Sequence, residues 1–176
     1  MRDESNRGLE EARFRVVFSH LGAVKAYALR RGSRDAEALA AETMTIAWRR
    51  LADVPRDDAR PWLYATARNL LLEESRKRRA TAVLAETDDH VPAVALREID
   101  PDLSRALRAL SAFDREALLL IAWEDLTPTQ AARALGITAA AFRVRLLRAR
   151  RRLRAALADP PDIAHQAVPQ LDVEGS

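Results

Sequence analysis

The most chemically distinctive stretch of this chain is an arginine-rich segment near its C-terminal end. Seven arginines fall between Arg143 and Arg154, and guanidinium side chains are long enough to reach guanine edges or phosphate oxygens. Apolar side chains on the same helix face suit contact with thymine methyl groups. At about 100° per residue, one face of a helix here gathers both kinds. Its residues are Ala140, Arg143, Val144, Leu147, Arg148 and Arg151.

The residues around this segment predict a helix-turn-helix. Thr127 can cap a first helix, with Pro128 at its first position and Gln130 completing a capping box. Gly136 can end that helix, and Thr138 can cap the second one. The face opposite the arginines is apolar and is expected in the core. Its residues are Phe142, Leu146, Ala149, Leu153 and Leu157.

This pattern leaves two interpretations of the arginine-rich face. Exposed arginines often form only a solvated surface, and Leu147 could widen the apolar stripe instead of contacting a base. A capped helix and a glycine corner directly before the arginines favour nucleic-acid binding.

Composition limits the class of protein. The chain has 176 residues, 48% of them hydrophobic, and only five glycines, which is typical of a helical globular protein. Its 29 basic residues are nearly offset by 26 acidic ones, so the net charge of +3 does not indicate a generic DNA-coating polycation. The basic residues cluster instead, at 76–79 and 143–154.

Several functional classes find no support in the sequence. The absence of cysteine excludes disulfides and thiolate zinc sites, and His20, His90 and His165 are far apart. There is no glycine-rich phosphate loop and no paired metal-ligand spacing. We therefore expect no enzyme activity, catalytic residue, metal or cofactor. No apolar run approaches the roughly 18 residues of a membrane span, and the N-terminus lacks a signal-peptide core. These features predict a cytoplasmic protein without membrane insertion.

Helical periodicity predicts an all-α chain with two small helical domains joined by a flexible linker. In the first domain, 9–80, one long helix runs from about Leu9 to Arg31, Ser33 caps a second that reaches Leu51, and Pro61 begins a third that ends at Arg79. The apolar stripe of the first helix, which is expected in the core, consists of Phe14, Val17, Phe18, Leu21, Val24, Tyr27 and Ala28. Residues 81–101 are predicted to be the linker. The second domain, 102–158, has helices near 102–109 and 114–123 before the helix-turn-helix. Residues 159–176 are expected to be a disordered tail.

Two blocks of the sequence resemble the conserved regions of a known family. The segments 35–51 and 60–71, followed by the basic run Arg76-Lys-Arg-Arg79, resemble conserved region 2 of bacterial RNA polymerase sigma factors of the extracytoplasmic-function (ECF) class. Segment 110–120, the helix-turn-helix and the closing arginines resemble region 4 of the same class. The two blocks occur in the family's order and cover most of the chain.

The resemblance implies two partners, core RNA polymerase and promoter DNA. In the family, region 2 docks on the β′ clamp helices and opens the −10 promoter element, while region 4 reads the −35 element and meets the β flap. Ala38 and Ala41 depart from the family, which commonly has an acid and a glutamine there. The implied polymerase-binding residues are Asp35, Glu37, Glu42, Trp48 and Arg49. The alternatives are that the acids favour the helix N-terminus and that Trp48 lies in the core.

The resemblance also implies two sets of DNA-contacting residues. The turn 53–60 resembles the family's loop that captures a flipped −10 base, and Trp62 after it is expected in the core. Asn69 could read that unstacked base or serve as a helix-packing amide. The implied −10 set is Arg68, Asn69, Arg76, Lys77, Arg78 and Arg79. The implied −35 set is Thr138, Ala140, Arg143, Val144, Leu147, Arg148 and Arg151.

The sequence therefore predicts a sigma factor that binds core polymerase and directs promoter-specific transcription initiation. Many family members are held by an anti-sigma factor, which makes such a protein a further candidate partner. The main alternative is a stand-alone dimeric helix-turn-helix regulator. A response regulator would need the alternating strands and helices of a receiver domain, which the first block lacks. An adaptor without DNA contact would leave the arginine-rich helix unexplained.

Overall fold

Helices make up both blocks of the molecule in the computed structural model, which describes residues 2–82 and 100–158. The described residues contain no strand, so the predicted all-α class is confirmed. The linker 81–101 lies almost entirely outside the described residues, and the tail 159–176 lies wholly outside them. The first block consists of α1 (Arg2–Phe18), α2 (Leu21–Arg30), α3 (Ala36–Arg49), the 3₁₀ turn η1 (Leu51–Asp53) and α4 (Arg60–Ala82).

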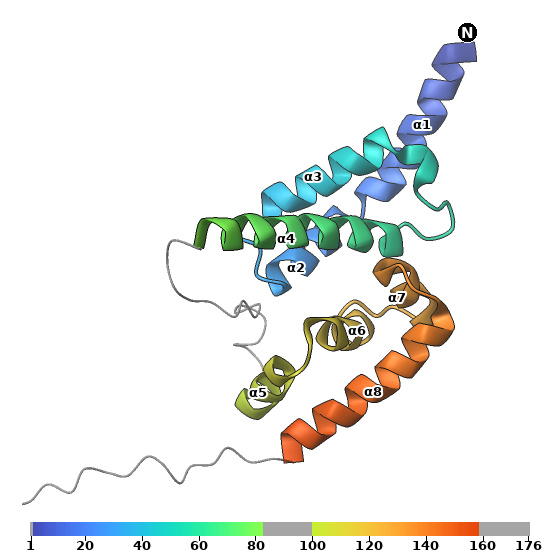
Figure 1. Ribbon diagram of the computed structural model, residues 1–176. Helices are drawn as coiled ribbons and strands as arrows, with labels where there is room; N and C mark the ends of the chain where they lie inside the picture. Colours follow the sequence, from blue (N-terminus) through green and yellow to red (C-terminus); the bar gives the residue numbers. More distant parts are fainter. Residues whose placement is uncertain (1, 83–99, 159–176) are drawn as a thin grey trace, which may run out of the picture.

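The second block of the described residues consists of four further helices. They are α5 (Pro101–Ala109), α6 (Ala112–Ala122), α7 (Pro128–Leu135) and α8 (Ala139–Ala158). Figure 1 shows α4 crossing in front of α2, with α3 above α4 and α6, α7 and α8 below it.

The prediction of one long first helix is wrong, because the chain breaks between α1 and α2. At this break the N–H of His20 bonds the carbonyl of Val17, three residues back, and the Ser19 hydroxyl donates to the carbonyl of Val16. These local bonds tighten the chain into a turn. The predicted core stripe also fails at Phe18, which is 47% exposed.

A second correction concerns the start of α3. Asp35, not Ser33, is the N-cap, because its carboxylate accepts from the N–H of Ala38 at 2.8 Å. Ser33 donates instead to Glu74 of α4 at 3.2 Å, which ties the chain before α3 to the neighbouring helix. The acid at this position therefore fixes the beginning of α3 through an N-cap bond.

The helix-turn-helix is formed as predicted. The Thr127 hydroxyl accepts from the N–H of Gln130, the Gln130 side chain accepts from the N–H of Thr127, and Gly136 ends α7 in the left-handed conformation. Thr138 accepts from the N–H of Ala141 at 3.1 Å and so caps α8. The core face of α8 is buried at Phe142, Leu146 and Ala149. The prediction that Leu157 belongs to this apolar stripe is wrong, because its side chain is 42% exposed.

The two blocks share one continuous core. Leu63 and Ala67 of α4 belong to the same buried cluster as Leu135 of α7 and Phe142 of α8. Helix α4 packs against α7, and α7 packs against α8. A smaller cluster around Leu107 and Leu110 anchors α5 to the rest of the second block. The helix-turn-helix is thereby held directly against α4 of the first block.

Candidate nucleic-acid interface

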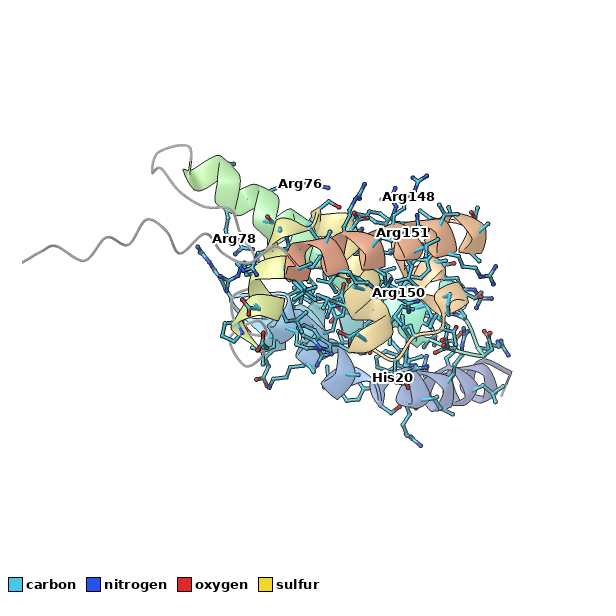
Figure 2. All side chains as sticks on the ribbon, turned by 90° about the horizontal axis from the view of Figure 1, so that it is seen from below. His20, Arg76, Arg78, Arg148, Arg150 and Arg151 are labelled. Carbon is cyan, nitrogen blue, oxygen red and sulfur yellow. The ribbon has the colours of Figure 1, made fainter. Side chains whose placement is uncertain are left out.

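Every residue of the expected −35 set on α8 and its cap is exposed. Val144 and Leu147 are 51% and 52% exposed although they are apolar, so Leu147 does not extend the core stripe. Arg143, Arg148 and Arg151 are exposed beside them. Figure 2 shows Arg148 and Arg151 on α8, with His20 at a distance from both. An exposed face that mixes arginines with apolar side chains has the chemistry needed to contact base edges and phosphates in a major groove.

Contacts from α6 fix how α8 presents this face. The carboxylate of Asp114, which is itself only 3% exposed, pairs with Arg152. The guanidinium of Arg145 lies 4.0 Å from the centre of the Phe113 ring. Two of the seven arginines are therefore engaged within the block. The contact of Arg145 with an aromatic ring fits a cation–π interaction.

The expected −10 residues on α4 lie in different environments. Asn69, Arg76 and Lys77 are exposed, so Asn69 is not a buried packing amide. Arg68 is half-buried, with its guanidinium 5.9 Å from the Phe113 ring of the second block. Arg78 is half-buried near the C-terminal end of the helix (Figure 2).

Arg79 and Lys77 complete the expected −10 set. The side chain of Arg79 lies outside the described residues. Glu73 and Lys77 form a surface ion pair at 2.8 Å. This pair raises the pKa of Lys77 and lowers that of Glu73, through their hydrogen bond first and their charges second. Trp62 is half-buried at the start of α4, with the guanidinium of Arg50 5.9 Å from its ring centre.

The loop between η1 and α4, residues 54–59, is anchored at both ends. Val54 is buried, and its carbonyl accepts from the guanidinium of Arg13 of α1. Asp58 accepts from the N–H of Arg60 at 3.1 Å, at the beginning of α4. A groove runs beside this loop between α1 and η1. The sequence-predicted base-capturing turn is therefore an ordered loop with charged side chains at Arg56 and Asp57.

The expected polymerase-binding residues all lie on α3 or at its cap, with exposed side chains. Asp35, Glu37, Glu42 and Arg49 are exposed polar residues. Trp48 is 45% exposed, so it is not a core residue. The Glu37 carboxylate accepts from Lys25 of α2 at 2.7 Å, but both partners remain open to solvent.

An apolar groove around Trp48 was not foreseen from the sequence. It lies between α1 and α3, where the Trp48 ring meets the edge of Phe14 with the ring centres 4.9 Å apart. Phe18 and Leu21 complete its apolar wall. The prediction of a single helix through 9–31 had assigned these residues to the core. After the break Phe18 is exposed beside α3, whereas Phe14 and Leu21 are half-buried and pack against the core.

A buried ion-pair network between the blocks was also missed. The guanidinium of Arg31 bonds the carboxylates of Glu116 at 3.1 Å and of Glu124, and its side chain is only 6% exposed. Arg30 reaches Glu124 as well, and the Tyr27 hydroxyl donates to Glu116 at 2.9 Å. Partners 85 to 94 residues apart leave no local signal in the sequence.

Burial and charge shape the ionisation of this network. Burial works against the charge of Arg31, but the neighbouring carboxylates prevail and raise its pKa. Burial first, and the Glu116 carboxylate second, raise the pKa of Tyr27 well above its usual value of 10.0. The Tyr64 ring stacks on Tyr27 with the centres 4.9 Å apart, and burial raises its pKa too. Both phenols are thus neutral, and Arg31 is charged, at physiological pH.

Within residues 2–82 and 100–158, no helix has the length and apolarity that a bilayer crossing requires. No group of three or more histidine, aspartate or glutamate side chains in the same ranges could hold a metal ion.

Two family models match the chain, in the order of its two blocks. Residues 16–81 match sigma-70 region 2, and residues 101–153 match sigma-70 region 4. The first match contains α2 to α4, with the loop 54–59 and the expected −10 residues. The second contains the helix-turn-helix and the whole arginine-rich face.

Known proteins resemble the chain over most of its length. A probable RNA polymerase sigma factor, RfaY of Xanthomonas campestris pv. campestris, is 33% identical over 162 residues, which cover 84% of this chain. The chain spans only 40% of the length of that relative. The sigma factor RpoE from Bartonella quintana, solved in complex with the anti-sigma factor NepR, is 25% identical with a TM-score of 0.61, covering 82% of this chain and 95% of that one.

A second solved structure agrees with the first. CnrH, solved in complex with the cytosolic domain of CnrY, is 28% identical with a TM-score of 0.59, covering 84% of this chain and 89% of that one. Three findings indicate the same family. They are the two sigma-70 regions in the family's order, a sigma-factor relative, and the shared folds. The chain belongs to the sigma-70 family of bacterial RNA polymerase sigma factors, in its extracytoplasmic-function class.

Proposed function

We propose that this protein binds core RNA polymerase and directs it to specific promoters. The observation that carries the proposal is the pairing of two surfaces in one chain. Helix α8 presents an exposed face of arginines and apolar side chains after a fully capped turn. Helices α3 and α4 present exposed polar residues in the block that matches region 2.

Each surface has a distinct role in this proposal. Helix α3 docks on the β′ clamp helices through Asp35, Glu37, Glu42, Trp48 and Arg49. Asn69 and Arg68 on α4 contact the opened −10 strand, and Arg76, Lys77, Arg78 and Arg79 contact phosphates. The exposed face of α8 reads the −35 element in the major groove, and the second block meets the β flap. The chain supplies promoter recognition, and the polymerase supplies the chemistry, in the cytoplasm.

Regulation by an anti-sigma factor belongs to the same proposal. The two solved relatives were each captured with a partner, NepR described as an anti-sigma factor in one case and the cytosolic domain of CnrY in the other. Their similarity to this chain supports a protein partner of the same kind here.

Association with core polymerase tests the proposal directly. The purified chain should co-elute with core RNA polymerase in size-exclusion chromatography and should confer initiation at discrete start sites on genomic fragments. A dimeric helix-turn-helix regulator would behave differently. Tight sequence-specific DNA binding by the free chain, without binding to the polymerase, would replace our proposal with that alternative.

A further inference from the structure

The loop 54–59 is tied to α1 through its backbone. The guanidinium of Arg13, 41 residues earlier in the chain, donates a hydrogen bond to the carbonyl of Val54. Val54 is only 1% exposed, and among the described residues its carbonyl accepts no other hydrogen bond. A buried carbonyl that loses its donor is left unpaired, or the backbone around it moves until water reaches it. Arg13 therefore fixes the first residue of the loop.

Packing on both sides of Arg13 holds α1 in place. Val17, one helical turn further along the same side, is 4% exposed and belongs to the same buried cluster as Val54. Phe14, the neighbour of Arg13, meets the ring of Trp48 on α3 with the ring centres 4.9 Å apart. Figure 1 shows α1 passing beside the end of α3 from which the chain continues into η1 and the loop. The guanidinium is thus presented to the loop from a helix that is itself anchored.

The rest of the loop has only a local backbone anchor. The carboxylate of Asp58 accepts from the first N–H of α4 at 3.1 Å, which fixes the far end of the loop. Arg56 and Asp57 lie between the two anchors and are exposed. Helix α7 contacts the loop through the side chains of Asp57 and Asp58, so these contacts leave the backbone at Val54 to Arg13. The position of the exposed residues therefore depends on a bond from a different helix.

We propose that Arg13 is a positioning residue for recognition of the −10 element. It holds the loop 54–59, through the carbonyl of Val54, in the place where the loop receives an unstacked base, and it does not contact the DNA itself. A loop that is already ordered loses less conformational freedom when the base binds, so the correct base is better distinguished from the others. The match to sigma-70 region 2 begins at residue 16, so it contains the loop but not Arg13. The inference rests on the proposed function for the role of the loop, whereas the anchoring can be measured in the free chain.

Hydrogen exchange of the free chain measures the anchoring without polymerase or DNA. Arg13→Ala removes the donor, and Arg13→Lys keeps a cation that can donate to the same carbonyl. The matched control is Arg7→Ala, which removes an equal charge from an exposed position on the same helix. Mass spectrometry follows deuterium uptake in peptides that contain residues 54–59. If Arg13→Ala fails to fold, Arg13→Gln, which keeps a neutral donor on a shorter side chain, takes its place.

We expect Arg13→Ala to accelerate exchange in the loop roughly tenfold or more, because a hydrogen bond from a charged donor is lost. Its helicity by circular dichroism should match that of the parent. The Arg7→Ala control should exchange as the parent does, and Arg13→Lys should stay closer to the parent than to the alanine variant. Unchanged exchange in a folded Arg13→Ala protein would overturn the anchoring role.

Promoter opening by holoenzyme then tests the consequence for recognition. Permanganate reactivity is measured on two sets of promoters, with single-base changes in the −10 element or in the −35 element. In Arg13→Ala, discrimination at one −10 position should fall roughly tenfold while discrimination within the −35 element is unchanged. Arg13→Lys should restore most of the lost discrimination. A general loss of stability would not separate the two elements in this way.

Three other results have distinct meanings. Equal loss of discrimination at both elements would reduce Arg13 to a general structural role, and this result overturns the inference. Weaker binding to every promoter alike, with the salt dependence reduced by about one contact, would make Arg13 a phosphate contact and also overturn it. Failure of the parent chain to bind core polymerase would contradict the proposed function, while hydrogen exchange still decides whether Arg13 orders the loop.

Discussion

Arginines on α8 differ in what they can reach, and this difference is testable one residue at a time. Arg143 and Arg148 flank the exposed apolar residues Val144 and Leu147. Replacing Arg143 or Arg148 with alanine should cost about 1–3 kcal/mol at the cognate −35 element if the guanidinium bonds a guanine edge, and should relax specificity at one base pair. Binding of polymerase holoenzyme to a set of single-base promoter variants measures this.

Arg151 and Arg154 provide the matched comparison. If they contact phosphates, their alanine variants should weaken binding to every promoter variant alike and reduce the salt dependence by about one contact each. Uniform losses from Arg143 and Arg148 as well would assign them to the backbone, and sequence recognition would rest on the apolar residues or on DNA shape.

Asn69 should act at a later step than the arginines of α8. Its amide is exposed on α4 and can both donate to and accept from an unstacked base. We expect Asn69→Ala to impair promoter opening more than formation of the closed complex. Permanganate reactivity of melted thymines measures opening, and gel-shift titration of holoenzyme measures closed-complex formation. Normal permanganate reactivity in the variant would remove Asn69 from the role of base contact.

Local chemistry made some of these residues predictable. The structure has the predicted capping box of Thr127 with Gln130 and the left-handed Gly136. Both features could be predicted because they depend on residues at most nine positions apart. The pairing of Arg31 with Glu116 depends on how two blocks dock, and no periodicity encodes it. The same holds for Phe113, whose ring lies near Arg68 of one block and Arg145 of the other.

At the scale of elements, we expect polymerase docking to depend on α3. Glu42 and Arg49 are exposed and lie off its buried stripe, so reversing both charges should leave the fold intact. We expect Glu42→Arg with Arg49→Glu to weaken binding to core polymerase at least about tenfold while helicity is retained. Each reversed side chain would meet a like charge on the polymerase where the parent residue meets an opposite one. Fluorescence anisotropy of the labelled chain with core polymerase measures the affinity.

The control for this pair reverses two exposed charges on α1, Arg7→Glu with Glu11→Arg, again without changing net charge. Its affinity should match that of the parent. If the α3 variant also binds as the parent does, α3 is not the docking helix.

Element boundaries show where sequence reasoning succeeds and where it fails. The end of α7 at Gly136 was predictable, because a residue that tolerates positive φ can end a helix there at little cost in free energy. The break after Phe18 was not, since apolar spacing continues through it and no glycine or proline marks it. As a result the groove beside Trp48 was hidden within an expected core stripe.

At the scale of the whole molecule, the buried ion-pair network of Arg30, Arg31, Glu116 and Glu124 predicts a response to alkaline pH. The pKa of Tyr27 is raised in the folded chain by burial and then by Glu116, with Arg31 and Arg68 acting in the opposite direction. Its neutral form therefore stabilises the fold fully below the usual value of 10.0. This stabilisation falls as the pH rises from there through the raised pKa, because an unfolded molecule releases the proton more readily.

Tyrosinate absorbance can follow this directly, because the chain has only two tyrosines, Tyr27 and the stacked Tyr64. In the parent chain both phenols should titrate later than free tyrosine. In the variant Glu116→Gln with Glu124→Gln, the titration should move back toward the usual value. Identical titration curves for the two proteins would show that these carboxylates do not control the titration of Tyr27.

Run-off transcription with purified core RNA polymerase tests the central claim most directly. A template library of genomic promoter fragments, transcribed with core polymerase alone and with core plus this chain, should yield discrete transcripts only in the second case. Alanine at Arg143 and Arg148 should abolish or redirect them. Transcription that stays at the level of core polymerase alone, from a chain that is folded and bound to the polymerase, would contradict the account of this protein as a promoter-directing sigma factor.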